Sequence, residues 1–155
     1  MKIAKWNEKA SAILDKLCME NNVKYCNRDD GVVFCDHLGT WLLYVPDIHV
    51  LNANNGKDSI PGLSAAFDRA LSSDSQLVES SVSGWLGGMK CREFTKGDMK
   101  VYAQEKFLRK FPKNTMFYVQ DEYKPIIAGI WESKKLTVIG FVLPVRLMNR
   151  TFEIA

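Results

Sequence analysis

The stretch from Met99 to Leu147 constrains the fold more than any other part of this 155-residue sequence, because its hydrophobic period changes twice. Met99 to Ala103 alternates apolar and polar side chains, which predicts a short strand. Residues 104 to 111 then place their apolar side chains on one arc of about 100° and their cations on the opposite arc. Pro112 ends this predicted helix because proline cannot donate the next backbone hydrogen bond. We therefore expect a strand followed by a short amphipathic helix with a cationic outer face.

Three further strands are predicted after Pro112. They cover Thr115 to Val119, Pro125 to Trp131 and Leu136 to Leu143, and polar turns at 120–122 and 132–135 separate them. The order of elements is strand, helix and three antiparallel strands. We expect this βαβββ unit to form one sheet, with its helix covering one face of that sheet.

The N-terminal part of the chain predicts a helix followed by a meander. Residues 3–20 place their apolar side chains on one arc of a helix, and four lysines cluster beside that arc. Strands are expected at 23–26 and 32–37, around a turn whose residues tolerate positive φ, and again at 40–45. The four lysines beside the apolar arc are Lys2, Lys5, Lys9 and Lys16.

The middle of the chain is less regular. Its composition predicts a loop at 52–62, a short helix at 63–71 and a half-buried strand at 76–83. A tight turn at 84–88, a strand at 89–94 and a hairpin turn at 96–98 lead into the stretch described first. We expect one α+β domain, divided into a first half at 1–51, an insertion at 52–80, a second half at 81–147 and a tail. The tail, 148–155, is expected to cap a sheet edge or to fold over a groove.

Composition sets the class of protein but not its function. The hydrophobic content of 46% is ordinary for a globular chain, and a net charge of +3 does not by itself indicate a nucleic-acid binder. No apolar run approaches the ~20 residues needed to span a bilayer, and the N-terminus lacks the apolar stretch of a signal peptide. We therefore expect a cytoplasmic protein without membrane contact. In that compartment the four cysteines are expected to be reduced structural thiols (Cys18, Cys26, Cys35 and Cys91).

The residues that carry chemistry in enzymes are sparse. His37 and His49 are the only histidines, and neither has a second metal-ligand type at a suitable spacing. The sequence contains no nucleophile elbow, no phosphate-binding loop and no paired metal-ligand motif. We expect a protein that is not an enzyme and that holds no cofactor and no metal.

Two short segments of the second half resemble a known family. Lys124-Pro125-Ile126-Ile127 opens one predicted strand, and Leu143-Pro144-Val145-Arg146-Leu147 closes the unit. Together with the βαβββ order, they resemble the C-terminal domain of a bacterial DNA polymerase sliding clamp over about fifty residues. Asp36 to Trp41 resembles the clamp pattern more loosely, since the Gly-His-Arg order of that family's turn is missing. The resemblance implies two βαβββ-like halves with antiparallel sheets and helices on one face.

In that family the helices touch the DNA backbone and an apolar slot holds peptides of partner proteins. By resemblance, the two predicted helices would contact double-stranded DNA without reading its sequence. A clamp ring contains six such domains, so this chain would need six copies, a homo-oligomer. The implied DNA-contact residues are Lys5, Lys9, Lys16, Lys106, Arg109 and Lys110. The implied protein-binding residues are Leu143, Pro144, Val145, Arg146 and Leu147.

Two alternatives stay open beside a clamp-like role. A one-domain relative carried by a phage would bind and block a host or defence protein, because fold does not fix function. A structural or regulatory α+β domain unrelated to clamps would use its charges only for solubility. We predict a protein that acts first through protein contacts and second through DNA contact.

Overall fold

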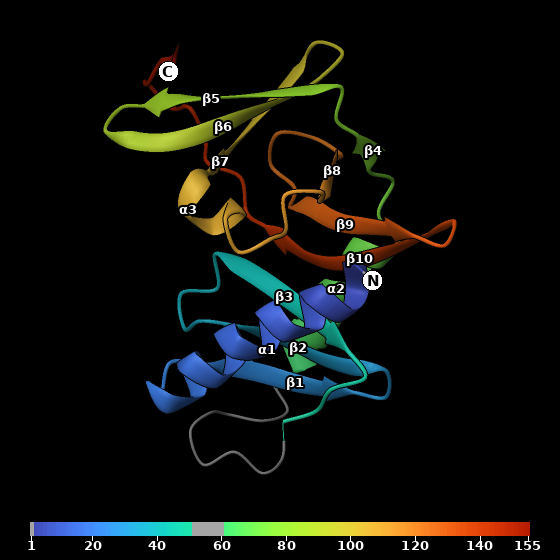
Figure 1. Cartoon of the computed structure of the whole chain (residues 1–155). Coiled ribbons are helices and arrows are strands. Elements are labelled where there is room, and N and C mark those ends of the chain that lie inside the picture. Colours follow the sequence, from blue (N-terminus) through green and yellow to red (C-terminus); the bar gives the residue numbers. More distant parts are fainter. Residues whose placement is uncertain (1, 51–60) are drawn as a thin grey trace.

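A computed structural model, which describes residues 2–50 and 61–155, contains two antiparallel sheets and three helices (Figure 1). The predicted loop at 52–62 falls almost entirely outside the described residues. No helix within the described ranges is both long and apolar enough to cross a membrane. The helices are α1 (Lys2–Met19), α2 (Pro61–Leu71) and α3 (Glu105–Leu108). The strands are β1 (Lys24–Arg28), β2 (Gly31–Cys35), β3 (Trp41–Pro46), β4 (Gln76–Leu77), β5 (Ser80–Leu86), β6 (Met89–Lys96), β7 (Met99–Gln104), β8 (Met116–Val119), β9 (Ile126–Glu132), β10 (Lys135–Val142) and β11 (Phe152–Ile154).

The larger sheet combines strands from both ends of the chain. Its seven strands run in the order β1-β2-β3-β10-β9-β8-β4, so β10 of the C-terminal part pairs with β3 of the N-terminal part. The β1–β2 hairpin turns at Asp29 and Asp30, where sequence predicted a turn, with Arg28 opposite Gly31. The α+β class is confirmed. The expectation that each half forms a sheet of its own is wrong, because the β3–β10 pairing merges strands of both halves.

Helices cover opposite faces of the seven-stranded sheet, which corrects the expectation of helices on one face. Along β3 the side chains alternate: Leu43 and Val45 pack in the core beneath α1, and Leu42 and Tyr44 pack against α2. The figures agree, since α1 lies in front of this sheet in Figure 1 and α2 lies behind it. Because helices pack on both faces at these strands, all residues of β2 and the residues of β3 up to Val45 are buried.

The Arg28 side chain ties α2 to the edge of this sheet. Its Nη1 donates to Ser64 Oγ at 2.7 Å and lies 2.9 Å from Asp68 Oδ1, and its guanidinium carbon lies 5.0 Å from the centroid of the Phe67 ring. Phe67 in turn stacks on Tyr44 with a 4.6 Å centroid separation. The contacts fix α2 along the sheet and thereby define the groove along its flank.

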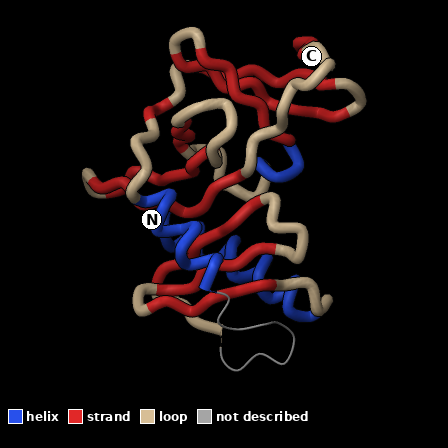
Figure 2. Tube along the Cα trace, turned by 180° about the vertical axis from the view of Figure 1, so that it is seen from behind, coloured by secondary structure: helices blue, strands red, loops and turns tan. Residues whose placement is uncertain are grey.

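The smaller sheet has the order β11-β5-β6-β7. It lies at the end of the molecule that carries the C-terminus (Figure 2). The strand β7 at 99–104 belongs here and not beside β8–β10, so the predicted single-sheet βαβββ unit is wrong. The short Gly97 hairpin gives β7 a local partner, β6, before any distant strand is needed. The tail caps the free edge of β5 through β11, which confirms one of the two expectations for 148–155.

The turn predicted at 84–88 begins only at Gly87 in the structure, and Gly84 lies in a strand for a reason of its own. The strand β5 continues to Leu86, and only Gly87 and Gly88 turn. A Cβ at position 84 would overlap the backbone oxygen of Glu153 and the ring of Phe152. Gly84 therefore permits the close approach of β11, and its place in the sequence does not mark a turn.

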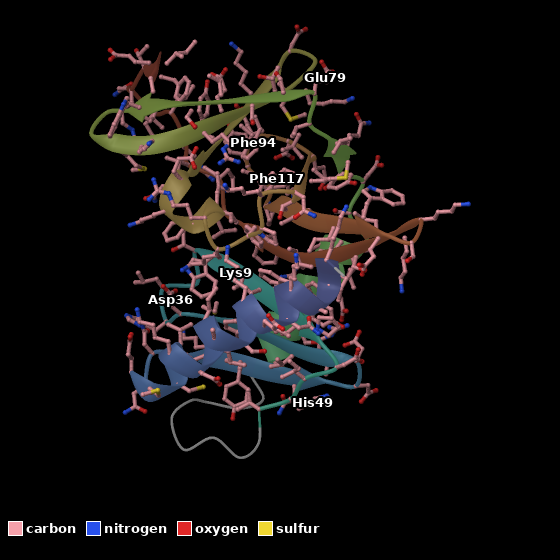
Figure 3. All side chains as sticks on the ribbon, viewed as in Figure 1. Lys9, Asp36, His49, Glu79, Phe94 and Phe117 are labelled. Atoms are coloured by element: carbon pink, nitrogen blue, oxygen red, sulfur yellow. The ribbon has the colours of Figure 1, made fainter. Side chains whose placement is uncertain are left out.

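The two sheets meet at a junction of aromatic side chains. Phe94 of β6 and Phe117 of β8 face each other across the gap, with ring centroids 5.0 Å apart (Figure 3). Beside it, Glu105, at the start of α3, is buried and accepts hydrogen bonds from Arg92 Nε and Nη2, each at 3.0 Å, and from Ser83 Oγ at 2.8 Å. This ion pair holds α3 on the smaller sheet.

Candidate functional site

The lysines of α1 all lie on the flank that faces the segment after α3. Trp6, Ala10 and Leu14 anchor the buried side of the helix, and a helical period puts the lysines on one neighbouring arc. Lys5 is exposed, whereas Lys2 donates from Nζ to the carbonyl oxygen of Trp131 at 3.2 Å. The flank thus keeps the arrangement that sequence predicted.

Lys9 joins α1 to the turn that follows α3. Its Nζ donates to the backbone oxygens of Arg109 at 3.0 Å and of Phe111 at 3.2 Å (Figure 3). Partial burial lowers the pKa of Lys9 below its ordinary value. Lys9 therefore satisfies the free carbonyls at the end of a short helix, a role that the sequence did not indicate.

The predicted helix at 104–111 forms, but it is shorter than expected: α3 ends at Leu108 and only turns continue to Phe111. Lys106 and Arg109 are exposed, as predicted. Lys110 is half-buried, with its Nζ 4.5 Å from the centroid of the Trp41 ring. Burial lowers the pKa of Lys110, the Asp36 charge opposes this, and the Lys16 charge adds to it.

The structure thus brings together cations from α1 and from residues 106–113, segments about 100 residues apart in the chain. We call this group the cationic face. Two of the six predicted cations, Lys9 and Lys110, hold the face together. Lys113, which follows Pro112, was missed by the sequence reasoning because no period extends beyond the proline. The members of the cationic face are Lys2, Lys5, Lys9, Lys16, Lys106, Arg109, Lys110 and Lys113.

Two adjoining cavities run along the cationic face. One, of 660 Å³, lies between the sheets and is lined by Lys9, Arg92, Arg109 and Lys113 beside the aromatic pair of the junction. The other, of 520 Å³, lies at the start of α1 and is lined by Lys2, Lys5, Lys9 and Lys113. Both are lined by Lys9, Pro112 and Lys113, so they adjoin at these residues, and we call the two cavities together the cationic hollow.

The acids in this hollow are few. Glu79 lines the first cavity and Glu132 the second. Glu132 is already engaged, since its carboxylate accepts from the backbone N–H of Lys2 at 2.7 Å. Among the described residues, neither Lys5 nor Arg109 makes an ion pair. The hollow therefore presents unneutralised positive charge to solvent.

The predicted protein-binding residues do not form one site. Leu143 lines a 760 Å³ groove beside α2. Val145, Arg146 and Leu147 line a separate 260 Å³ cavity, where the Arg146 guanidinium carbon lies 4.9 Å from the centroid of the Tyr123 ring. The backbone N–H of Val145 donates to the Tyr102 oxygen at 2.7 Å, so this segment also connects the two sheets. Pro144, half-buried between the two cavities, lines neither of them.

The histidines and cysteines offer no catalytic cluster in the ranges 2–50 and 61–155. The His49 ring lies 2.6 Å from the backbone oxygen of Arg28, at the far end of the larger sheet from the cationic hollow (Figure 3). The His37 ring contacts the side chain of Asn22. No group of three or more potential metal ligands occurs in those ranges, and all four cysteines are free. Burial raises the pKa of the Cys35 thiol to about 11, which keeps it protonated.

Comparisons with protein-family models, with curated proteins and with solved structures found no match to this chain.

Proposed function

We propose that this chain is a non-enzymatic binding protein whose cationic face holds the phosphate backbone of double-stranded DNA. The observation that carries the proposal is the pair of adjoining cavities that are lined by lysines of α1 together with Arg109 and Lys113. Phosphate groups are recognised by lysine and arginine side chains that reach solvent, and such contacts carry no base sequence. The binding is therefore independent of sequence and depends on salt.

The members of the cationic face contribute unequally. Lys5, Lys106, Arg109 and Lys113 are exposed and supply the phosphate contacts. Lys9 and Lys110 contribute mainly by fixing the distance between α1 and the turn after α3. Lys16 lies 4.0 Å from Glu20, which partly neutralises it.

Anisotropy of a short labelled DNA duplex, measured between about 50 and 200 mM salt, tests the proposal. The variant carrying Lys5→Gln and Arg109→Gln removes two cations that reach phosphates. At low salt each removal should weaken binding on the order of tenfold, and the salt slope should fall by about 2. The charge-matched control carries Arg69→Gln and Lys124→Gln, which lie beside the groove on the α2 side of the sheet.

The control variant should bind like the unchanged protein. If the unchanged protein does not retain DNA at low salt, or if both variants lose affinity equally, the cationic face is not a DNA site. Two duplexes of unrelated sequence should bind with the same affinity, and a strong preference for one would contradict backbone recognition.

The clamp-like mode stays a further proposal for the same face. Encirclement of DNA requires six copies of this chain, and light scattering distinguishes a hexamer from a monomer. A monomer would rule out encirclement but would leave backbone binding intact.

Protein binding is the second candidate function, including the block of a host protein by a phage-encoded inhibitor. The specific observation is an apolar shelf around the 260 Å³ cavity, formed by Tyr123, Leu147 and Met148 with exposed fractions of 59%, 38% and 82%. Exposed apolar residues that cluster in this way are typical of protein-contact surfaces. A partner captured by the unchanged chain but not by a variant with Leu147→Lys and Met148→Lys would support it. Capture that depends only on Lys5 and Arg109 would contradict it.

A further inference from the structure

The groove beside α2 has a volume of 760 Å³. It runs along the flank of α2 from Leu63 to Ala70, and strands β3, β10 and β9 form its floor. The helix α2 packs on β1, β2 and β10 and leaves this part of the sheet face open.

The groove has an apolar interior. Leu42, Ile127 and Phe141 form the floor and are all buried, and they come from three adjacent strands. Ala66 of α2 and Leu143 after β10 line the sides, and Leu143 keeps an exposed fraction of 40%. Small-molecule sites in proteins have volumes of about 300–1,000 Å³ and mostly apolar walls, and this groove meets both conditions.

The mouth of the groove carries positive charge. Arg69 on α2 and Lys124 in the β8–β9 turn both line it and are both exposed. Neither makes an ion pair with any described residue. Asp121 accepts from the backbone N–H of Lys124 at 2.9 Å, which fixes the turn that carries this lysine. Asp74 is the one acid in the lining formed by described residues, so the cations outnumber it.

We propose that this groove binds an amphiphilic anion, an aliphatic chain that ends in a carboxylate. The chain would lie on Leu42, Ile127 and Phe141, which removes its apolar surface from water. The carboxylate would lie at the mouth between Arg69 and Lys124, where charge-assisted hydrogen bonds favour an anionic head group over a neutral or cationic one. The site is separate from the cationic face, because α1 and α2 cover opposite faces of the sheet.

Titration calorimetry with dodecanoate, below its critical micelle concentration, tests the proposal. Dodecanoate should bind, and dodecyltrimethylammonium, which has the same chain and the opposite charge, should bind on the order of tenfold more weakly. Arg69→Gln with Lys124→Gln should abolish this preference, whereas Lys5→Gln with Arg109→Gln should preserve it. These two double variants are the same pair as in the DNA experiment with their roles exchanged, so failure at one site is distinguishable from failure at the other.

A matched pair of substitutions on α2 tests the location. Ala66 lines the groove, whereas its neighbour Ala65 is exposed and does not. Ala66→Trp fills the groove and should abolish dodecanoate binding, and Ala65→Trp should leave it unchanged. Circular dichroism of both variants confirms folding, and the charge variants keep the test valid if Ala66→Trp does not fold.

Three results would overturn the proposal. The first is no binding of dodecanoate, and the second is equal binding of the two amphiphiles. The third is a groove that takes a peptide or a second copy of the chain but not dodecanoate. In that case an acidic amphipathic peptide would bind, or the chain would form a dimer that Ala66→Trp abolishes.

Discussion

The two sheets of this chain are covered in different ways, and the difference separates a stable core from a region held by a few contacts. Helices pack on both faces of the seven-stranded sheet at β2 and β3, so these two strands have no half-exposed face. The four-stranded sheet packs one face on the core through Phe94 and Val101, while on its other face Tyr102 contacts Phe152 of the C-terminal tail. We infer that substitutions in the first sheet unfold the whole chain and those under the tail act locally.

The largest expected effect comes from Trp6→Ala. The Trp6 side chain is fully buried, donates from Nε1 to the Tyr44 oxygen at 2.8 Å and stacks on Phe111, so it joins α1 to both neighbouring layers. Its loss should lower the free energy of unfolding by about 4 kcal/mol in a denaturant titration. Trp85→Ala, at a 44% exposed tryptophan of the smaller sheet, should cost about 1 kcal/mol or less. Equal losses of unfolding free energy for the two variants would contradict the contrast between the two sheets.

The second effect concerns the ion pair between Arg92 and Glu105, which holds α3 on the smaller sheet. Burial alone would raise the pKa of Glu105, but the hydrogen bonds from Arg92 and Ser83 outweigh it and lower that pKa in the folded state. Glu105 therefore contributes stability that is present above its ordinary pKa of 4.5 and is lost as the pH falls through the folded value. Glu105→Gln should cost about 2 kcal/mol at neutral pH.

The acid side of the stability curve is the sharper measurement of this pair. The difference between Glu105→Gln and the unchanged chain should shrink as the pH falls from 4.5 through the lowered pKa of the folded state, because folded Glu105 then takes up a proton and loses its charge. Glu153→Gln, at an exposed carboxylate of β11, is the control and should change stability by about 0.5 kcal/mol at most. A difference that stays constant with pH would show that the Glu105 charge does not stabilise the packing of α3 on the smaller sheet.

The smallest global effect is expected from Gly84→Ala. The added Cβ overlaps Phe152 and the Glu153 backbone, so β11 should detach from β5. Hydrogen exchange should accelerate at Glu153 and Ala155, whose N–H groups face β5, while the free energy of unfolding falls by about 1 kcal/mol.

Gly88→Ala is the control for this detachment, since a Cβ there meets open space. If Gly84→Ala instead unfolds the whole chain, the tail belongs to the cooperative core and the contrast between the sheets is wrong.

The sequence predicted those elements that depend on local pattern. The period of Trp6, Ala10 and Leu14 fixes α1, and the turn residues fix the β1–β2 hairpin. The lysine flank of α1 was also predictable, because it follows from the same period. These features need only neighbouring residues.

Features that depend on distant partners were not predictable. The alternation of Met99 to Ala103 indicates a strand but not which sheet it joins, and it joins β6. Gly84 was predicted to lie in a turn because it is a glycine. The residue that requires a glycine at this position, Phe152, lies far along the chain, so the sequence pattern did not indicate it. The contact of Lys9 with the turn after α3 likewise depends on a fold that brings residues about 100 positions apart together.

The pairing of β3 with β10 has a consequence for synthesis on the ribosome. Trp41 to Leu43 pair with Gly140 to Val142, so this edge of β3 lacks its partner until nearly the whole chain has been translated. At about 5–20 residues per second, roughly a hundred intervening residues take on the order of 5–20 seconds. During that interval the nascent N-terminal segment exposes an apolar strand edge, which is the kind of surface that chaperones shield and that aggregation exploits.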